Sequence, residues 1–413
     1  MTARVRRARA CALLALGAGL ALPASGAAQA RMADVARGVH VAEHAGATLV
    51  AVTVVVPAGS ADDPRDLPGT ARLTAETIAQ GIRWRLDPDA SRLDLRVERG
   101  WTAFTLLAAP DVWARAWGVV EDALFRLPVG DAPMAAAREQ LVSGFAFEEG
   151  APVREFQREF YRTLTSAVDP WSRDPRGNPE ALRRIDQLAL AGFRSTHYVM
   201  SRATVAAVGP ITERAGREAL APLGTTPPMT GSGFRGPAWE RGARTPLARE
   251  VTNTWIGAAF PAPPDLPRTQ LEFAALELEE ALNPDPPDPG MFSATVRIED
   301  TPRGPVMVAQ AAVMPEVAAN WERRITRAIE QLSEERDEPF FRMQRRRFRS
   351  AILMREGVPE EASLRMALDL MREGRVRPLQ QEVWEIGADE LADAVDALEA
   401  PRILLMGPEI PAP

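Results

Sequence analysis

The pattern of apolar and polar positions predicts β-strands interleaved with helices. Val39 to Val56 is rich in β-branched residues and is interrupted at Ala45-Gly46-Ala47, so we predict two strands joined by a turn. A helix over Gly69 to Gly81 follows a polar loop. Leu93 to Ala109 alternates around Glu98-Arg99-Gly100, which predicts a hairpin.

Apolar residues three and four positions apart recur along the rest of the chain and predict further helices. In the first half these helices span Val112–Leu127, Ala132–Phe147, Phe156–Ala167 and Asn178–Tyr198, and a buried strand spans Ala203–Val208. In the second half the predicted helices span Arg268–Leu282, Glu316–Glu335, Pro339–Arg355, Glu360–Arg372 and Ala388–Leu398. The predicted strands there span Val251–Phe260, Met291–Ile298, Pro305–Val313 and Arg402–Met406.

The two halves repeat one pattern. Each opens with a strand, a proline-containing loop and a helix, and each closes on a strand that ends in Gly-Pro, at Gly209-Pro210 and at Gly407-Pro408. We therefore predict an α+β fold of two homologous modules, each a mostly antiparallel sheet with helices packed on one face. The proline- and glycine-rich stretch 224–246 is the predicted linker, and the modules are assigned to 31–223 and 247–413.

Residues 1–30 have the features of a secretory signal peptide. Arginines precede an apolar stretch from Cys11 to Leu22, and Ala28-Gln29-Ala30 is a small-residue cleavage site. We therefore expect an exported protein, periplasmic or secreted. Arg6-Arg7 leaves both the general secretory route and the twin-arginine route open. The only cysteine leaves with this peptide.

Net charge and hydropathy argue against two kinds of binding partner, nucleic acid and the membrane interior. The formal net charge of −7 becomes −11 when residues 1–30, with four arginines and no acidic residue, are removed. An acidic surface disfavours nucleic acid as a partner. After the signal peptide there is no second apolar run of bilayer length, so we expect no integral membrane segment in the mature chain.

One stretch has the letters of a zinc motif. His40, Glu43 and His44 form His-x-x-Glu-His, which binds zinc when a helix brings the two histidines to within about 6 Å of one another. On a strand they would lie about 13 Å apart, too far for one metal ion. Glycines flank the stretch and leave only about seven residues for a helix, so we predict a strand. A zinc site is the alternative.

Three stretches resemble the pitrilysin/insulinase family of metallopeptidases. They are VAVTVVVPAGSADDP at Val50–Pro64, the helix from Gly69, and Asp169–Ile211. The chain is similar to the bacterial members that are like mitochondrial processing peptidase subunits, with the LuxS/MPP-like metallohydrolase fold. The resemblance covers nearly all of the mature sequence. It implies two modules that, in active relatives, face partner modules across a closed chamber.

The resemblance also implies a degenerate metal site. Active members bind zinc through His-x-x-Glu-His on the opening helix and a glutamate on a later helix. Here Arg72 and Glu76 stand at the two histidine positions, Ala75 at the base and Gly144 at the later glutamate. Phe292 stands at the position of a substrate-contacting tyrosine, with no arginine before it at the family's spacing. We therefore expect no zinc, no other cofactor and no proteolysis at this position.

The function that follows is a non-catalytic, exported subunit that pairs with a catalytically active relative and shapes a peptide-binding chamber. Two alternatives remain open. One is a scaffold or peptide-binding protein without a protease partner. The other is a zinc peptidase whose site is rebuilt from His40, Glu43 and His44. The sequence leaves the partner, the peptide and the oligomeric state undetermined.

Overall fold

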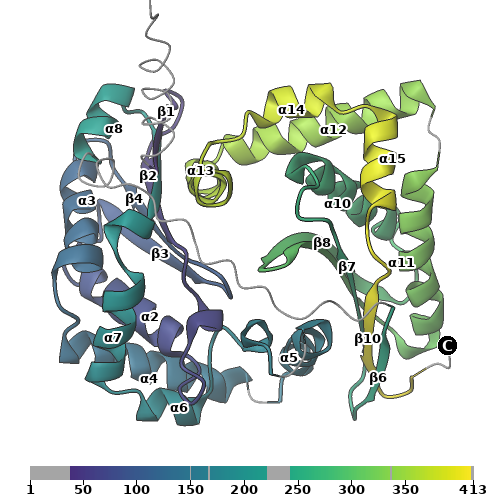
Figure 1. The fold of residues 1–413 in the computed structure, drawn as a ribbon, viewed down its shortest axis with the longest axis horizontal. Helices are drawn as coiled ribbons and strands as arrows, with labels where there is room; N and C mark the ends of the chain where they lie inside the picture. Colours follow the sequence, from purple (N-terminus) through teal and green to yellow (C-terminus); the bar gives the residue numbers. More distant parts are fainter. Residues whose placement is uncertain (1–37, 149, 166–167, 221–241, 335–336, 411–413) are drawn as a thin grey trace, which may run out of the picture.

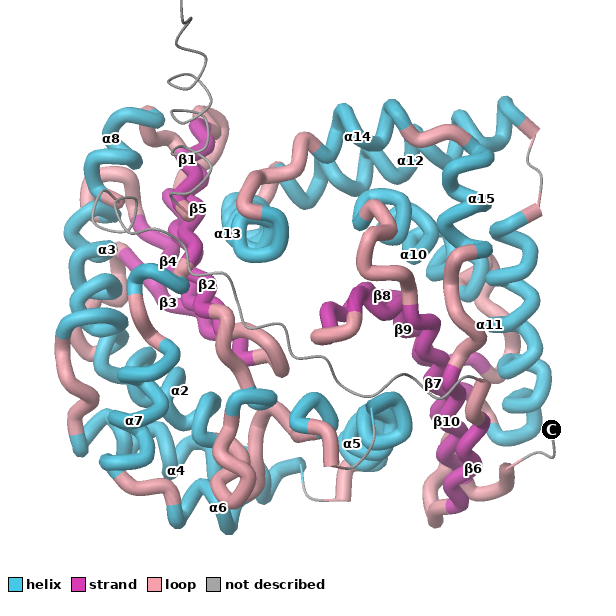
Figure 2. Tube along the Cα trace, viewed as in Figure 1, coloured by secondary structure: helices cyan, strands magenta, loops and turns pink. Residues whose placement is uncertain are grey.

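The computed structural model describes residues 38–410 except 149, 166–167, 221–241 and 335–336. The predicted signal peptide and most of the predicted linker lie outside these residues. The described residues form two modules that lie side by side, each with one five-stranded sheet (Figures 1 and 2). None of the described helices is both long enough and apolar enough to cross a membrane.

The N-terminal module has the strand order β1-β5-β2-β4-β3. Only β1 and β5 are parallel, and the other neighbours are antiparallel. The strands are β1 (Val39–Glu43), β2 (Val50–Val56), β3 (Ser91–Val97), β4 (Thr102–Ala108) and β5 (Thr204–Gly209). The helices are α2 (Thr70–Arg83), α3 (Trp113–Glu121), α4 (Asp131–Glu148), α5 (Pro152–Thr165), α6 (Pro179–Arg184), α7 (Gln187–His197) and α8 (Glu213–Ala219).

The C-terminal module repeats this topology with the order β6-β10-β7-β9-β8. Its strands are β6 (Arg244–Ala248), β7 (Thr254–Pro261), β8 (Met291–Thr301), β9 (Gly304–Val313) and β10 (Arg402–Gly407). Its helices are α10 (Arg268–Leu282), α11 (Ala318–Ser333), α12 (Glu338–Glu356), α13 (Pro359–Glu373), α14 (Leu379–Glu385) and α15 (Ala388–Asp396). The matching strand orders confirm the predicted α+β fold of two homologous modules.

Several boundaries differ from the sequence prediction. The helix predicted over Asn178–Tyr198 is two helices, because the Asp186 side chain accepts a hydrogen bond from the Ala189 N–H and caps α7 as a new helix. The strand β6 begins inside the predicted linker and pairs with β10 at the edge of the sheet, where its proline at 246 is tolerated. The short helices α8 and α14 were not predicted.

Each sheet packs against helices of its own module on one face, as predicted, and a helix from the other half of the chain covers the opposite face. In β2, Val52, Val54 and Val56 belong to the core that the module shares with its own helices. On the opposite face, Val55 belongs to a cluster with Leu364 of α13. The equivalent helix of the first half, α5, packs on β7 and β10 of the second (Figure 1). Burial on both faces explains why β2 is apolar at every position except Thr53.

The contact of α5 with the C-terminal sheet depends on one glycine. Phe156 and Phe160 of α5 pack in a cluster with Ala259 and Met406. Gly257 lies directly beneath them, since a Cβ at this position would be 2.5 Å from the Phe160 ring. Glycine is therefore required for the close approach of helix and sheet.

Candidate functional site

The helix α2, where the sequence resemblance places the metal motif, has a firmly held start. Gly69 adopts a left-handed conformation with φ of 98°. The buried carboxylate of Asp63 accepts hydrogen bonds from the Gly69 N–H at 2.6 Å and the Ala71 N–H at 2.7 Å. These bonds satisfy backbone donors that a helix leaves unpaired at its N-terminus. The residues that follow are therefore fixed in orientation.

The three α2 positions assigned to the metal motif have different surroundings. Ala75 is fully buried in the core of its module. Arg72 and Glu76 lie one turn apart, with Arg72 Nη2 3.6 Å from Glu76 Oε2. Arg83 Nη1 donates to Glu76 Oε1 at 2.6 Å, and the Glu76 side chain is only 3% exposed. Two arginines and one buried carboxylate thus form an ion-pair cluster on this helix.

The fourth position, Gly144, lies on α4, which packs against α2. A Cβ at Gly144 would meet no described atom within 4 Å. Arg72 and Gly144 line the same cavity, whose volume is about 800 Å³. The structure therefore brings these two predicted positions to one hollow, which we call the α2–α4 cavity.

The walls of the α2–α4 cavity come from both modules. The hairpin of β3 and β4 contributes Glu98 and Arg99, α5 contributes Tyr161, and β8 contributes Arg297 and Glu299. The arginines that line the cavity are Arg72, Arg99, Arg154, Arg158, Arg176 and Arg297. The acidic residues that line it are Glu98, Asp174 and Glu299. The cavity is thus rich in positive charge.

A polar network joins the two modules at this cavity. Arg297 Nε donates to Glu299 at 2.8 Å, and its two terminal nitrogens donate to Gln310 at 2.9 Å and to the Tyr161 hydroxyl at 3.3 Å. The Tyr161 hydroxyl in turn donates to Glu299. Burial and the Glu299 carboxylate raise the pKa of Tyr161, so the hydroxyl stays protonated and remains a donor.

Arg99 is held differently. Its guanidinium lies over the Tyr161 ring, 3.1 Å from the ring centroid, and its Nε donates to the Trp171 carbonyl at 3.0 Å. Burial and the charge of Glu299 raise the pKa of the neighbouring Glu98.

The sequence did not identify the cavity-lining residues of β8 and α5, which are Arg297, Glu299 and Tyr161. Arg297 and Glu299 are two positions apart on a strand and therefore lie on the same face of the sheet. The alternation of polar residues along this stretch is a sequence signal that could have identified them. Tyr161 is one of only two tyrosines in the chain. Phe292, the residue assigned to substrate contact, lies on β8 beside a bulge, is 59% exposed and does not line the α2–α4 cavity. Its role stays a prediction.

The literal His-x-x-Glu-His motif lies where the strand prediction placed it. His40 and Glu43 belong to β1, which pairs with β5, and His44 follows the strand. Burial and the charges of Arg217 and Arg365 lower the pKa of His40. The part of the chain that the structure describes contains no group of three or more histidine, cysteine, aspartate or glutamate residues placed to hold a metal ion.

Comparisons with known proteins agree on the fold. No protein-family model and no curated protein matches the chain. Among solved structures, the inactive domain of a peptidase M16 from Pseudomonas fluorescens matches with a TM-score of 0.73 and 14% identity, over 91% of this chain and 96% of that one. A structure of complex III2 from Candida albicans matches with a TM-score of 0.71 and 13% identity, over 89% and 93%. The periplasmic protease PqqL from Escherichia coli matches with a TM-score of 0.66 and 12% identity, over 90% of this chain and 45% of that one.

These neighbours share the two-module architecture. Their sequence identities to this chain, 12% to 14%, are too low to show more than a common fold. The chain therefore has the fold of the M16 peptidases, the pitrilysin-like fold that the sequence resemblance implies.

Proposed function

We propose that this protein is a non-catalytic, exported subunit that pairs with an active M16-type peptidase and helps to form a peptide-binding chamber. The observation that carries the proposal is the ion-pair cluster of Arg72, Glu76 and Arg83 on α2. It occupies the helix on which the resemblance places the zinc ligands. The M16 inactive domain among the structural neighbours is a precedent for a chain of this fold without activity.

The chemistry of the substituted residues argues against hydrolysis at this position. A catalytic zinc ion takes three protein ligands and needs a base for its water. The Arg72 guanidinium offers only hydrogen-bond donors, and Ala75 and Gly144 offer no ligand atom. Glu76 is buried and paired with Arg83, so its carboxylate is already engaged. We therefore propose that the protein binds neither zinc nor another cofactor here.

Two further observations support the wider proposal. The predicted signal peptide agrees with export, and PqqL, a neighbour with the same fold, is described as periplasmic. The α2–α4 cavity offers a volume in the range of pockets that hold ligands in proteins. Peptides held there would be presented to the catalytic subunit across the interface.

Association with an active relative tests this proposal. The mature chain is co-expressed with a family member from the same organism that carries an intact His-x-x-Glu-His helix, and the pair is analysed by size-exclusion chromatography with light scattering. We expect a complex with one copy of each chain. Two separate peaks at micromolar concentrations of both proteins would contradict the proposed pairing.

A scaffold role without a protease partner is the second candidate. The structural likeness to a chain of complex III2 favours this role, because that chain belongs to a multi-subunit complex that is not named as a peptidase. The same chromatography distinguishes the two, because a scaffold would be monomeric or self-associating in the presence of the peptidase. In that case a screen for non-protease partners would follow.

A further inference from the structure

The α2–α4 cavity has a charge opposite to that of the whole protein. The chain carries 56 acidic residues against 49 basic ones, yet the cavity is lined by six arginines and three acidic residues. Such a local reversal of sign concentrates anionic groups from solution.

Two of these arginines have donor capacity that the described residues do not use. The Nε of Arg72 is buried and has no hydrogen-bond partner among the described residues. Its ion-pair partner Glu76 is held more closely by Arg83, at 2.6 Å against 3.6 Å. Arg99 donates through Nε to a carbonyl and stacks on Tyr161, but within the described residues it forms no ion pair. The Arg72 side chain is 27% exposed and lines the cavity, so a ligand there can reach its exposed part rather than the buried Nε.

We infer that the α2–α4 cavity binds a peptide segment with clustered aspartate or glutamate side chains, whose carboxylates accept hydrogen bonds from Arg72 and Arg99. The inference rests on the proposed function, because it names the class of peptide that the chamber takes. The volume of about 800 Å³ is far larger than a free inorganic anion needs, which favours a peptide. The planar guanidinium groups suit carboxylates, which they bind through paired hydrogen bonds.

Fluorescence anisotropy with two labelled peptides of equal length tests the inference. One alternates glutamate with alanine and the other glutamine with alanine, and the protein is the full mature chain. We expect the glutamate peptide to bind at least about tenfold more tightly, with an affinity that falls as salt is raised. Arg72→Gln and Arg99→Gln should each weaken that peptide roughly tenfold and leave the glutamine peptide unchanged.

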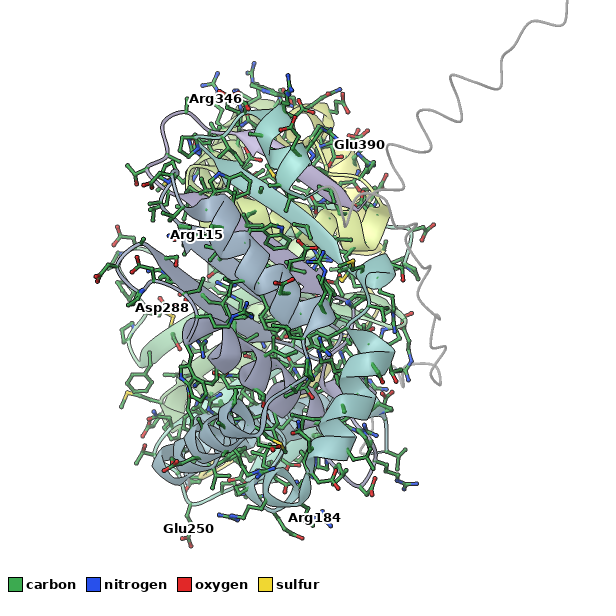
Figure 3. All side chains as sticks on the ribbon, turned by 90° about the vertical axis from the view of Figure 1, so that its left-hand side faces the viewer. Arg115, Arg184, Glu250, Asp288, Arg346 and Glu390 are labelled. Carbon is green, nitrogen blue, oxygen red and sulfur yellow. The ribbon has the colours of Figure 1, made fainter. Side chains whose placement is uncertain are left out.

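Arg115→Gln is the matched control, since Arg115 is exposed on α3 among the outer helices and its loss removes the same charge (Figure 3). It should leave binding unchanged. Arg72→Gln keeps Glu76 paired with Arg83, so the fold should persist. If that variant fails to fold, Arg99→Gln alone decides the question.

The other outcomes overturn the inference in distinguishable ways. Equal affinity for the two peptides would overturn it and leave the proposed peptide-binding function standing. Inorganic phosphate that competes as well as the glutamate peptide would reveal a small-anion site instead. Binding of neither peptide would overturn it as well, and the chromatography with the active relative would still test the pairing independently.

Discussion

Ser363 Oγ of α13 lies 2.7 Å from Thr53 Oγ1 in the middle of β2, although 310 positions separate the two residues. The bond is buried, and Thr53 Oγ1 also lies 3.0 Å from Thr105 Oγ1 on the neighbouring strand. A helix of the second half is therefore part of the first module's interior. Because α5 makes the converse contact, the two modules depend on one another for a complete core.

Ala367→Phe should separate α13 from the N-terminal sheet. Ala367 is fully buried against that sheet, and its carbonyl accepts a hydrogen bond from Thr204 Oγ1 at 2.8 Å. A phenyl group has no room there, so we expect a loss of about 2 kcal/mol in the free energy of unfolding and a larger radius of gyration in small-angle X-ray scattering. Glu361→Ala, at an exposed position of the same helix, is the control. An unchanged radius for Ala367→Phe would contradict the role of α13.

Two glycine-to-alanine variants should have opposite effects. Gly257→Ala brings a methyl group to 2.5 Å from the Phe160 ring and should cost about 1–3 kcal/mol in urea unfolding. Gly144→Ala adds a methyl group in open space within a helix and should stabilise by about 0.5–1 kcal/mol. Equal effects of the two variants would show that α5 can shift away from β7 at little cost.

Arg377 should be a large contributor to stability. Its side chain is 2% exposed and Nε lies 2.9 Å from Asp369 Oδ1, whose side chain is fully buried. Arg377 also reaches Glu272 of α10 at 3.1 Å, which links α13 to its own module. Arg377→Met removes one partner from each carboxylate, while Asp369 keeps Arg365 and Glu272 keeps Arg268. The loss of these charged hydrogen bonds should cost about 1.5–3 kcal/mol in chemical denaturation.

The control for this variant is Arg375→Met. Arg375 is 54% exposed, and its ion pairs with Glu373 and Glu382 are at the surface. Exposed pairs contribute little, so the change should stay within about 0.5 kcal/mol. Similar losses for both variants would mean that the buried pairing is not what stabilises α13.

The ion pairs around Arg377 should also make the free energy of unfolding depend on pH in acid. Burial acts to raise the pKa values of Glu272 and Asp300. The charges of Arg377 and Arg268 nevertheless hold the pKa of Glu272 below its usual range. Arg268 and Arg372 do the same for the pKa of Asp300. Groups with a lowered folded pKa add stability above the unfolded value of about 4, and this contribution is lost as the pH falls through the folded pKa.

The free energy of unfolding should therefore fall as the pH drops below about 4, because the unfolded chain takes up protons more readily there. Urea unfolding at a series of pH values measures this slope. Arg377→Met should flatten it, since Glu272 then loses the first of its stabilising charges. A slope identical to that of the wild type would assign the acid sensitivity to other carboxylates.

The repeat and most elements could be predicted because their signals are local. Arg268–Leu282 was predicted with the bounds that α10 has, from its apolar spacing. The two Gly-Pro endings marked the equivalent strands β5 and β10. In contrast, the break between α6 and α7 depends on one capping aspartate, and the edge strand β6 has a proline in a polar stretch, so neither has a strong periodic signal.

The long-range arrangement could not be predicted for a physical reason. The apolar faces of α5 and α13 require burial, but nothing in their spacing says which sheet they cover. The α2–α4 cavity likewise gathers Arg72, Arg99 and Arg297 from segments far apart in the chain. Sequence resemblance located Arg72 and Gly144 together, whereas the opposite wall of the cavity came only from the structure.

Titrating the peptidase activity of the active relative with this protein decides whether the chain acts as a non-catalytic partner. We expect that the chain alone hydrolyses no peptide, and that the partner's kcat/KM rises and saturates at one copy of each chain. An unchanged partner activity, or hydrolysis by the chain alone that a zinc chelator abolishes, would contradict it.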